Sequence, residues 1–309
     1  MTAADVYLQQ AINGVSLGAM YALLALGFTL VYGILELINF AHFNVFMVGS
    51  FVGLGMLELL GVTPNGAALT GAYLVGVLLL TFAVTMVASG ALGVAIERVA
   101  LRPLRNVRGP AAMITTIGVS YVLFNVVLLG VGADAKNFPS PLPSVSFALG
   151  GAVLRLREIL IWVVSLGLMG ALTYFVQFTK MGKAMRATAQ DPEAARMMGV
   201  EVDRVIITAF FLGSALAGAG GLMFGLYYNI TSYVIGFSAG LRAFTAAVLG
   251  GIGNVPGAML GGILIGLIEA FGSYWISAAW ADVIIFSILV LVLVFKPAGL
   301  LGRVAPNKS

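Results

Sequence analysis

The sequence contains no cysteine and very little charge. Of its 309 residues none is cysteine, one is histidine and 9% are charged. Without cysteine the chain has no disulfide framework, no thiolate nucleophile and no thiolate metal ligand, which excludes thiol redox chemistry. A single histidine also argues against a metal centre, because such centres combine several histidine, cysteine and carboxylate ligands. The scarcity of charge excludes an ordinary soluble domain.

Two common sequence signals are also missing. The chain has no G-x-x-x-x-G-K-[ST] phosphate-binding loop, since Gly182 and Lys183 are followed by Ala184. Any ATP that drives this protein is therefore expected to be hydrolysed by a partner, and we expect no cofactor bound by this chain. The N-terminal MTAADVYLQQ lacks the basic region and the cleavage site of a signal peptide, so the first apolar run is predicted to remain as a span.

Apolar residues make up most of what is present. They account for 61% of the chain, and the mean hydropathy is +1.06. A membrane-spanning helix needs about 20 apolar residues. Uncharged runs of this length include residues 6–35, 59–96, 109–133, 159–179, 205–241 and 243–268. The sequence therefore predicts an all-α polytopic membrane protein, with one transmembrane domain over residues 1–309.

Basic residues mark which end of the spans faces the cytoplasm. Short loops rich in Lys and Arg stay on the inner side. Three such segments hold Arg98, Arg102, Arg105 and Arg108; Lys180, Lys183, Arg186, Arg196 and Arg204; and Lys296, Arg303 and Lys308. The net charge of +4 and the pI of 9.4 are explained by this orientation, so no nucleic-acid partner is predicted. The proline-containing stretch 132–158 and the Trp-flanked turn 273–281 are predicted to lie outside.

The number of crossings cannot be read from clean helices alone. An inside C-terminal tail and an outside N-terminus require an odd number of crossings, whereas about eight clean helices are visible. We therefore expect irregular segments at residues 35–50 and 236–262, where polar or glycine-rich sequence interrupts an apolar run. Broken or re-entrant helices in corresponding positions of two halves often mark the pathway of a transporter. The prediction is eight to ten transmembrane helices.

Residues 180–204 form the most charged segment of the chain, with five basic and four acidic residues. Asp191 followed by Pro192 predicts a helix start, because Asp caps the first amides and Pro suits the first helical position. Glu193 then lies near the positive end of the helix dipole, and Gly199 supplies the end of the helix. An exposed helix of this kind fits a groove on a partner protein, or it lies on anionic lipid. The residues alone leave both interpretations open.

A few polar side chains are predicted at membrane depth, where they usually face a cavity or a partner. They are Glu36, Asn39, His42 and Asn44 in the first half, with Thr115, Thr116 and Ser120 as weaker candidates. They line a solute pathway, or they hydrogen-bond between helices while Glu36 lies at the inner interface. Thr and Ser also commonly bond their own helix backbone.

Two charges stand alone in the second half. Arg242 and Glu269 are the only charged residues between Val205 and Ala281. An ion pair between them is one way of tolerating both in a membrane. Alternatively, Arg242 holds a substrate carboxylate or extends to the interface.

Four motifs in order resemble a known family. They are LQQAINGVSLGAMYALLALGFTLVYGILELINFAHF, GKAMRATAQDPEAARMMGVEVDRV, AFTAAVLGGIGNVPGAMLGGILIGLIE and VLVFKPAGLLG. This set resembles the integral-membrane permease subunits of branched-chain amino acid ABC importers, the LivH/LivM type and LivH more closely. The resemblance implies the ABC importer permease fold, in a bacterial or archaeal cytoplasmic membrane. It also implies a second permease subunit, identical or paralogous, two cytoplasmic ATPases that use ATP and Mg²⁺, and a periplasmic or extracellular solute-binding protein.

The resemblance also assigns roles to residues. It implies that the segment from Gly182 to Gly199 is the helix that couples to an ATPase, within residues 180–204. The coupling residues would be Gly182, Arg186, Asp191, Pro192, Glu193, Ala194, Arg196 and Gly199. The predicted pathway residues, for a solute moved by alternating access, are Glu36, Asn39, His42, Phe43, Asn44 and Arg242.

One departure from the family leaves the solute open. Members usually read INFAHG followed by an acidic residue, whereas His42 is followed here by Phe43 and Asn44. Branched-chain amino acids are the main expectation, with other amino acids, short amides or urea as alternatives. A secondary transporter or channel is disfavoured, because Glu269 alone makes no carboxylate relay. An intramembrane enzyme is disfavoured because the spans lack a nucleophile, metal cluster or carboxylate pair.

Overall fold

The computed structural model describes residues 2–64, 66–105, 107 and 110–302. Within this part of the chain, eight helices have the length and composition to cross a membrane, and one shorter apolar helix joins them. The nine are α1 (Ala3–Leu35), α2 (Ala41–Leu59), α3 (Gly71–Ile96), α4 (Ala111–Val131), α5 (Leu156–Phe178), α8 (Val202–Tyr228), α9 (Ile235–Gly250), α10 (Val255–Trp275) and α11 (Ala281–Phe295). They confirm the all-α class.

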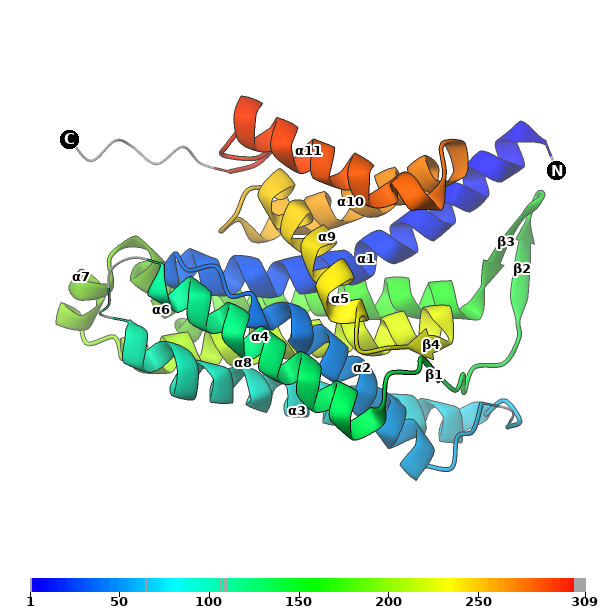
Figure 1. The fold of residues 1–309 in the computed structure, drawn as a ribbon, viewed down its shortest axis with the longest axis horizontal. Coiled ribbons are helices and arrows are strands. Elements are labelled where there is room, and N and C mark those ends of the chain that lie inside the picture. Colours follow the sequence, from blue (N-terminus) through cyan, green and yellow to red (C-terminus); the bar gives the residue numbers. More distant parts are fainter. Residues whose placement is uncertain (1, 65, 106, 108–109, 303–309) are drawn as a thin grey trace.

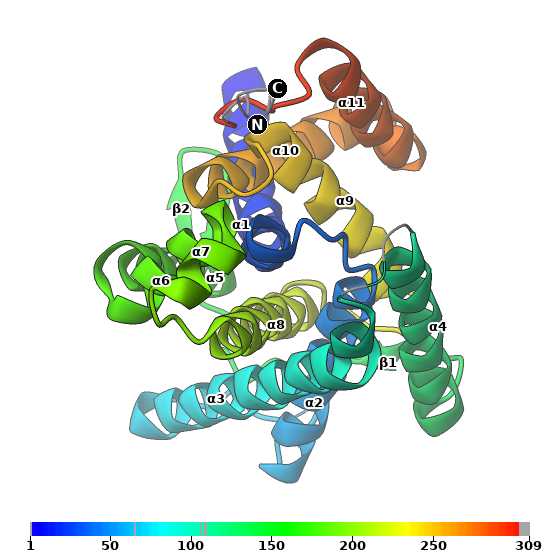
Figure 2. The same ribbon diagram turned by 90° about the vertical axis from the view of Figure 1, so that its left-hand side faces the viewer.

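Helix α1 forms the centre of the bundle (Figure 2). It packs against α5, α8, α9 and α10, and its middle residues, such as Tyr21 and Leu24, are fully buried. A helix that is apolar on every side is expected in such a position. In contrast, α3, α4, α5 and α11 carry many exposed apolar side chains, which face lipid in a membrane.

Small residues allow the central helices to approach closely. A Cβ added to Gly18 of α1 would lie 2.6 Å from the Cα of Ile263 in α10, so only glycine fits there. A Cβ added to Gly213 of α8 would lie 3.1 Å from the Cα of Gly27 in α1. Close backbone packing of this kind stabilises helix pairs in lipid, where apolar side chains gain little by leaving the solvent.

The direction of the helices agrees with an odd number of crossings. Helices α6 (Lys180–Gln190) and α7 (Pro192–Met197) and the end of α11 lie at one end of the bundle. The start of α1 and the hairpin of β2 (Ser146–Leu149) and β3 (Ala152–Arg155) lie at the other (Figure 1). We call these the inner and the outer end, because the Lys- and Arg-rich segments mark the first. Between α8 and α10, the 16-residue helix α9 returns the chain toward the inner end. The prediction of eight to ten crossings is confirmed.

Both predicted irregular segments contain breaks. In the first, α1 ends at Leu35, Glu36 adopts a left-handed conformation with φ 52°, and helix resumes at Ala41. Residues 41–50 are helical, so this break is narrower than predicted. In the second, α9 and α10 are separated by a turn at residues 251–254. The Asn254 side chain caps α10 by accepting from the Gly257 amide at 3.1 Å and donates to the Leu301 carbonyl at 2.6 Å.

The outer loop differs from the sequence prediction, because it contains short strands. Strand β1 (Lys136–Asn137) pairs with β4 (Ile230–Thr231), and β2 (Ser146–Leu149) forms a hairpin with β3 (Ala152–Arg155). The hairpin turns at Gly150 and Gly151, the residue type that two-residue hairpin loops favour. The Gly151 amide donates to Asp5 at 2.9 Å, which fastens the loop to α1. Strands of two to four residues are too short to produce a recognisable alternation in the sequence.

Candidate functional site

The break after α1 carries most of the predicted pathway residues. Asn39, His42 and Asn44 are buried polar residues, whereas Glu36 is exposed at the inner end. The Asn39 side chain accepts a hydrogen bond from the Ala41 amide at 3.1 Å and so stabilises the start of α2. The structure therefore brings Asn39, His42 and Asn44 into the interior of the bundle and leaves Glu36 at its inner end.

A cavity of about 670 Å³ with mixed polar and apolar walls opens at the inner end. It lies between the end of α1, the end of α5, the start of α6 and the 251–254 turn. Two of its lining residues, Glu36 and Arg186, carry opposite charges. The Arg186 guanidinium donates to the carbonyls of Val176 and Gln177, which are otherwise unpaired at the end of α5.

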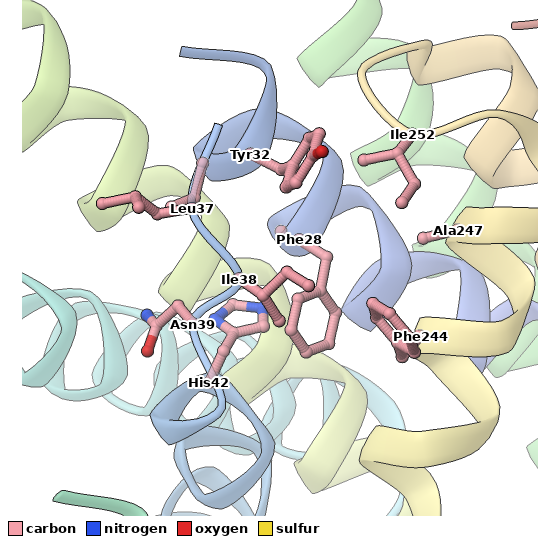
Figure 3. Close-up of a pocket in the computed structure, with 11 residues that line it drawn as sticks. Phe28, Tyr32, Leu37, Ile38, Asn39, His42, Phe244, Ala247 and Ile252 are labelled. Carbon is pink, nitrogen blue, oxygen red and sulfur yellow. The ribbon is translucent and has the colours of Figure 1, made fainter. Parts of the chain in front are cut away.

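A much smaller cavity of about 10 Å³ lies deeper in the bundle, with room for about one water molecule. Tyr32 and Ile252 line both cavities. Figure 3 shows the imidazole of His42 beside the ring of Phe28, and the two ring centroids are 4.7 Å apart. His42 Nε2 is buried and has no hydrogen-bond partner among the described residues. This small cavity, which Phe28 and Phe244 line, is too small for an amino acid.

His42 depends on a glycine. A Cβ added to Gly27 of α1 would overlap the His42 imidazole. The same glycine faces Gly213 of α8, so α1, α2 and α8 meet at this level. The INFAH sequence alone gives no sign of this three-helix contact.

Phe43 and Asn44 face another part of the bundle. Phe43 is buried in an aromatic cluster and lies 5.2 Å from Phe28 and 5.5 Å from Phe40, measured between ring centroids. Its ring occupies the space where Gly240 of α9 lacks a side chain. Both residues line a largely apolar groove of about 590 Å³ between α2, α4 and α9. The segment from His42 to Asn44 therefore separates the small inner cavity from this groove.

Helix α4 holds this segment through two hydroxyl side chains. Asn44 Nδ2 donates to the Ser120 carbonyl at 2.6 Å and to the Ser120 hydroxyl at 2.7 Å. Thr116 accepts from the Phe40 amide at 3.2 Å and donates to Met113 within its own helix at 2.8 Å. The sequence analysis named Thr116 and Ser120 as weak pathway candidates, with a bond to their own helix backbone as the alternative. The spacing of four residues, which places Thr116 and Ser120 on one helix face, is the signal that indicates their shared contact.

Arg242 lies between two carboxylates. Its Nε atom is 3.3 Å from Glu269 Oε2 in α10, and its Nη2 atom is 2.7 Å from Asp282 Oδ1 at the start of α11. Arg242 and Glu269 thus form the ion pair that the sequence analysis left open. None of the three cavities described above is lined by Arg242. Its contact with a solute stays a prediction, and Asp282 is a partner that the sequence analysis missed.

The charged segment at the inner end contains two short helices. They are α6 (Lys180–Gln190) and α7 (Pro192–Met197). Asp191 caps α7 by accepting from the amides of Glu193 and Ala194, each at 2.9 Å, and Gly199 ends it with φ 83°. These features confirm the predicted capped helix. However, α6 does not continue α5, because Thr179 breaks the chain between them and caps α6.

The predicted coupling residues divide into two groups. Pro192, Glu193, Ala194 and Arg196 are exposed on α7, beside Met197 and Met198, which are 88% and 84% exposed. Gly182 is buried against the end of α5. A Cβ at this position would overlap the Phe175 and Val176 carbonyls, so only glycine fits. With Arg186, it attaches α6 to α5. The surface available to a partner is therefore α7 and its C-terminal end, and Gly182 and Arg186 form its base.

Comparison with known proteins gives consistent relatives. A family model described as "Branched-chain amino acid transport system / permease component" matches residues 10–293. The high-affinity branched-chain amino acid transport system permease protein BraD of Pseudomonas aeruginosa is 42% identical over 303 residues, covering 96% of each chain. LivH of Escherichia coli K12, described in the same words, is 42% identical over 305 residues, with the same coverage. A probable LivH of Methanocaldococcus jannaschii is 28% identical over 302 residues, covering 92% of this chain and 89% of its own.

Proposed function

Because the chain belongs to the family of permease components of branched-chain amino acid transport systems, we propose that it forms the solute pathway of an ATP-driven ABC importer. It is a multi-pass protein of the inner membrane and a transport subunit, not an enzyme. The observation that carries the proposal is α7, an exposed and capped helix at the inner end. A short helix with exposed methionines and charges fits a groove on a soluble partner.

The partners follow from this function. Two cytoplasmic ATPases bind and hydrolyse ATP with Mg²⁺ and contact the permeases through α7. A second permease subunit, identical to this chain or a paralogue, completes the membrane assembly. A periplasmic or extracellular binding protein delivers the solute to the outer end. The missing phosphate-binding loop supports an external energy source, since the chain has no motif for cradling a nucleotide phosphate.

Transport proceeds by alternating access, with the segment from Asn39 to Asn44 as the barrier. The cavity of about 670 Å³ includes Glu36, and it shares Tyr32 and Ile252 with the one-water space that Asn39 and His42 line. Closure at Phe28 and Phe244 blocks a solute as large as an amino acid. Rearrangement of α2 against α1 and α9 is needed to open a route past these side chains.

The printed names of the relatives favour branched-chain amino acids as the solute. One observation favours a second candidate, urea or a short amide. Asn44 and Ser120 line the groove between α2 and α4, and they offer neutral hydrogen-bonding groups in place of a carboxylate. Both solutes are testable in the same vesicles.

The decisive experiment is uptake into vesicles that contain the assembled complex with its ATPases and binding protein. We expect ATP-dependent uptake of labelled leucine, isoleucine and valine, and its loss in a Glu193→Lys, Arg196→Glu variant that reverses the charges of α7. Lys180→Ala with Lys183→Ala is the control, because these lysines lie on α6. Uptake and assembly that survive the α7 reversal contradict docking through this helix. Uptake that needs an ion gradient and no ATP contradicts the importer itself.

A further inference from the structure

Four charged side chains form a network at the inner end, outside the solute pathway and outside α7. Arg102 and Arg105 follow α3, Glu97 lies at the end of α3, and Asp203 lies in the first turn of α8. Asp203 Oδ1 is 2.6 Å from Arg105 Nη1, and Asp203 Oδ2 is 2.9 Å from Arg102 Nη2. Each oxygen of this carboxylate therefore accepts from a different arginine.

Arg105 is the centre of the network. Its second terminal nitrogen pairs with Glu97, whose side chain is completely buried, whereas Asp203 is half exposed. Arginine suits this position, because its planar guanidinium holds two carboxylates in fixed directions. The guanidinium thus joins the buried end of one helix to the exposed start of another.

The end of α3 has an unusual shape at this network. Residues Glu97–Leu101 form a π-helical turn, and Arg102–Leu104 form a 3₁₀ turn. Such departures from α geometry occur frequently at functional sites and are places where a helix can change its winding. At these two turns, the side chains of Arg102 and Arg105 reach Asp203 of α8.

A short, hydrogen-bonded connection joins α7 to α8. Residues 198–201 separate the two helices, and within this connection the Gly199 amide donates to Arg196 and the Val200 amide donates to Ala195, each at 3.0 Å. Ala195 is buried against the rest of the chain. A displacement of α7 therefore moves the first turn of α8, where Asp203 lies.

Helix α8 reaches the barrier in the pathway. Its Gly213 faces Gly27, the residue that makes room for His42, and its Gly218 packs closely against Gly49 of α2. Helix α3 packs along the same helix, with Gly93 against Ser214 and Gly90 against Phe211. Two helices, α3 and α8, are thus bound together from the network to the level of His42.

We propose that Arg105, supported by Arg102, is a positioning residue that clamps α8 to α3, so that movement of α7 reaches the barrier through both helices together. This inference rests on the proposed function, because it assigns the route by which ATPase movement opens the pathway. With the clamp broken, α7 still binds the ATPase and hydrolysis continues, but the first turn of α8 moves without α3. ATP is then hydrolysed with less transport.

The test is Asp203→Asn, measured in the assembled complex as leucine uptake per ATP hydrolysed. Asparagine keeps the size of the side chain and leaves the buried pair of Glu97 and Arg105 in place, so the variant is expected to fold. We expect uptake per ATP to fall about fivefold or more, in the range of typical coupling between sites. Assembly and ATP hydrolysis should persist. A purely structural role lowers uptake and hydrolysis together and leaves their ratio unchanged.

The matched control is Glu201→Gln. Glu201 lies two residues from Asp203 and pairs with Arg204 at 2.7 Å, and among the described residues it forms no ion pair with α3. Its uptake per ATP should equal that of the unmodified chain. An unchanged ratio in Asp203→Asn overturns the clamp, as does an equal fall in both variants. If the unmodified complex shows no ATP-driven uptake of leucine, the proposed function fails and not the clamp alone.

A second measurement replaces the charges with a covalent link. The chain has no cysteine, so Arg102→Cys with Asp203→Cys offers one defined pair of thiols. The ratio should be low in this variant and should recover when a short bifunctional thiol reagent joins the two helices. Complete cross-linking with no recovery contradicts the idea that the connection itself carries the movement.

Discussion

Arg105 and Arg242 have similar surroundings but lie in different parts of the bundle. Each lies between two carboxylates from other helical segments, one buried and one exposed. The exposed fractions are 0% for Glu97 and 50% for Asp203 around Arg105, and 11% for Glu269 and 57% for Asp282 around Arg242. The difference is what they connect.

Arg105 joins α8 to α3 at the inner end, and α8 follows α7 along the chain. Arg242 joins α9, α10 and α11, within apolar helices where charges are costly unless paired. The same arrangement of an arginine between two carboxylates therefore has two different roles. Around Arg242 it neutralises buried charge, and around Arg105 it transmits movement. The predictions below test this difference.

The largest effect is expected from Arg242→Ala. Removal of the guanidinium leaves the buried Glu269 carboxylate without a counter-charge, which should lower the free energy of unfolding by about 3 kcal/mol or more. Thermal unfolding in detergent and the yield of folded protein measure this loss. Arg204→Ala is the control, because its exposed pair with Glu201 contributes less than about 1 kcal/mol. Equal stability of the two variants contradicts the assignment.

An intermediate effect is expected when both members of a buried pair are neutralised. Arg242→Gln with Glu269→Gln, and Arg105→Gln with Glu97→Gln, should each fold better than the single truncations, because no buried charge is left unpaired. The first pair should transport normally, whereas the second should lower uptake per ATP. If the first variant folds and hydrolyses ATP but takes up no leucine, Arg242 contacts the solute after all.

The smallest effect is expected from salt. Arg102 and Asp203 are both half exposed, so ions screen their attraction, with a Debye length of about 3 Å at 1 M salt. Uptake per ATP should fall modestly as the ionic strength on the inner side rises. In Asp203→Asn the same salt should produce no further fall. A salt effect that persists in this variant arises elsewhere in the complex.

Local patterns in the sequence predicted the parts that depend on neighbouring residues. Asp191, Pro192 and Glu193 predict the start of α7, and Gly199 predicts its end, because capping requires only adjacent side chains and backbone. The span from Ala111 to Val131 follows from an uncharged run bounded by charge. The Lys- and Arg-rich loops predicted which end of the bundle faces the cytoplasm, and the resulting parity called for one more return of the chain than eight clean helices supply.

The remaining features depend on contacts between distant parts of the chain. Asn44 meets Ser120 across 76 residues, and Arg105 meets Asp203 across 98 residues. No periodicity in one sequence reports such pairings, because they follow from the order in which the helices pack. Helix α9 was hidden for another reason, since the apolar run 205–241 continues through the outer turn without a charge.

The shortness of α9 also sets a requirement on the lipid bilayer. Sixteen helical residues rise ~24 Å, whereas the hydrocarbon layer is about 30 Å thick. The chain just before α9 is then at acyl-chain depth, where every backbone amide needs an internal partner. The pairing of Ile230–Thr231 with Lys136–Asn137 supplies these partners, and the Phe138 amide donates to the Asn229 carbonyl at 2.9 Å. The two-residue pairing of β1 with β4 thus gives the chain before α9 the internal hydrogen-bond partners that a helix shorter than the hydrocarbon layer requires.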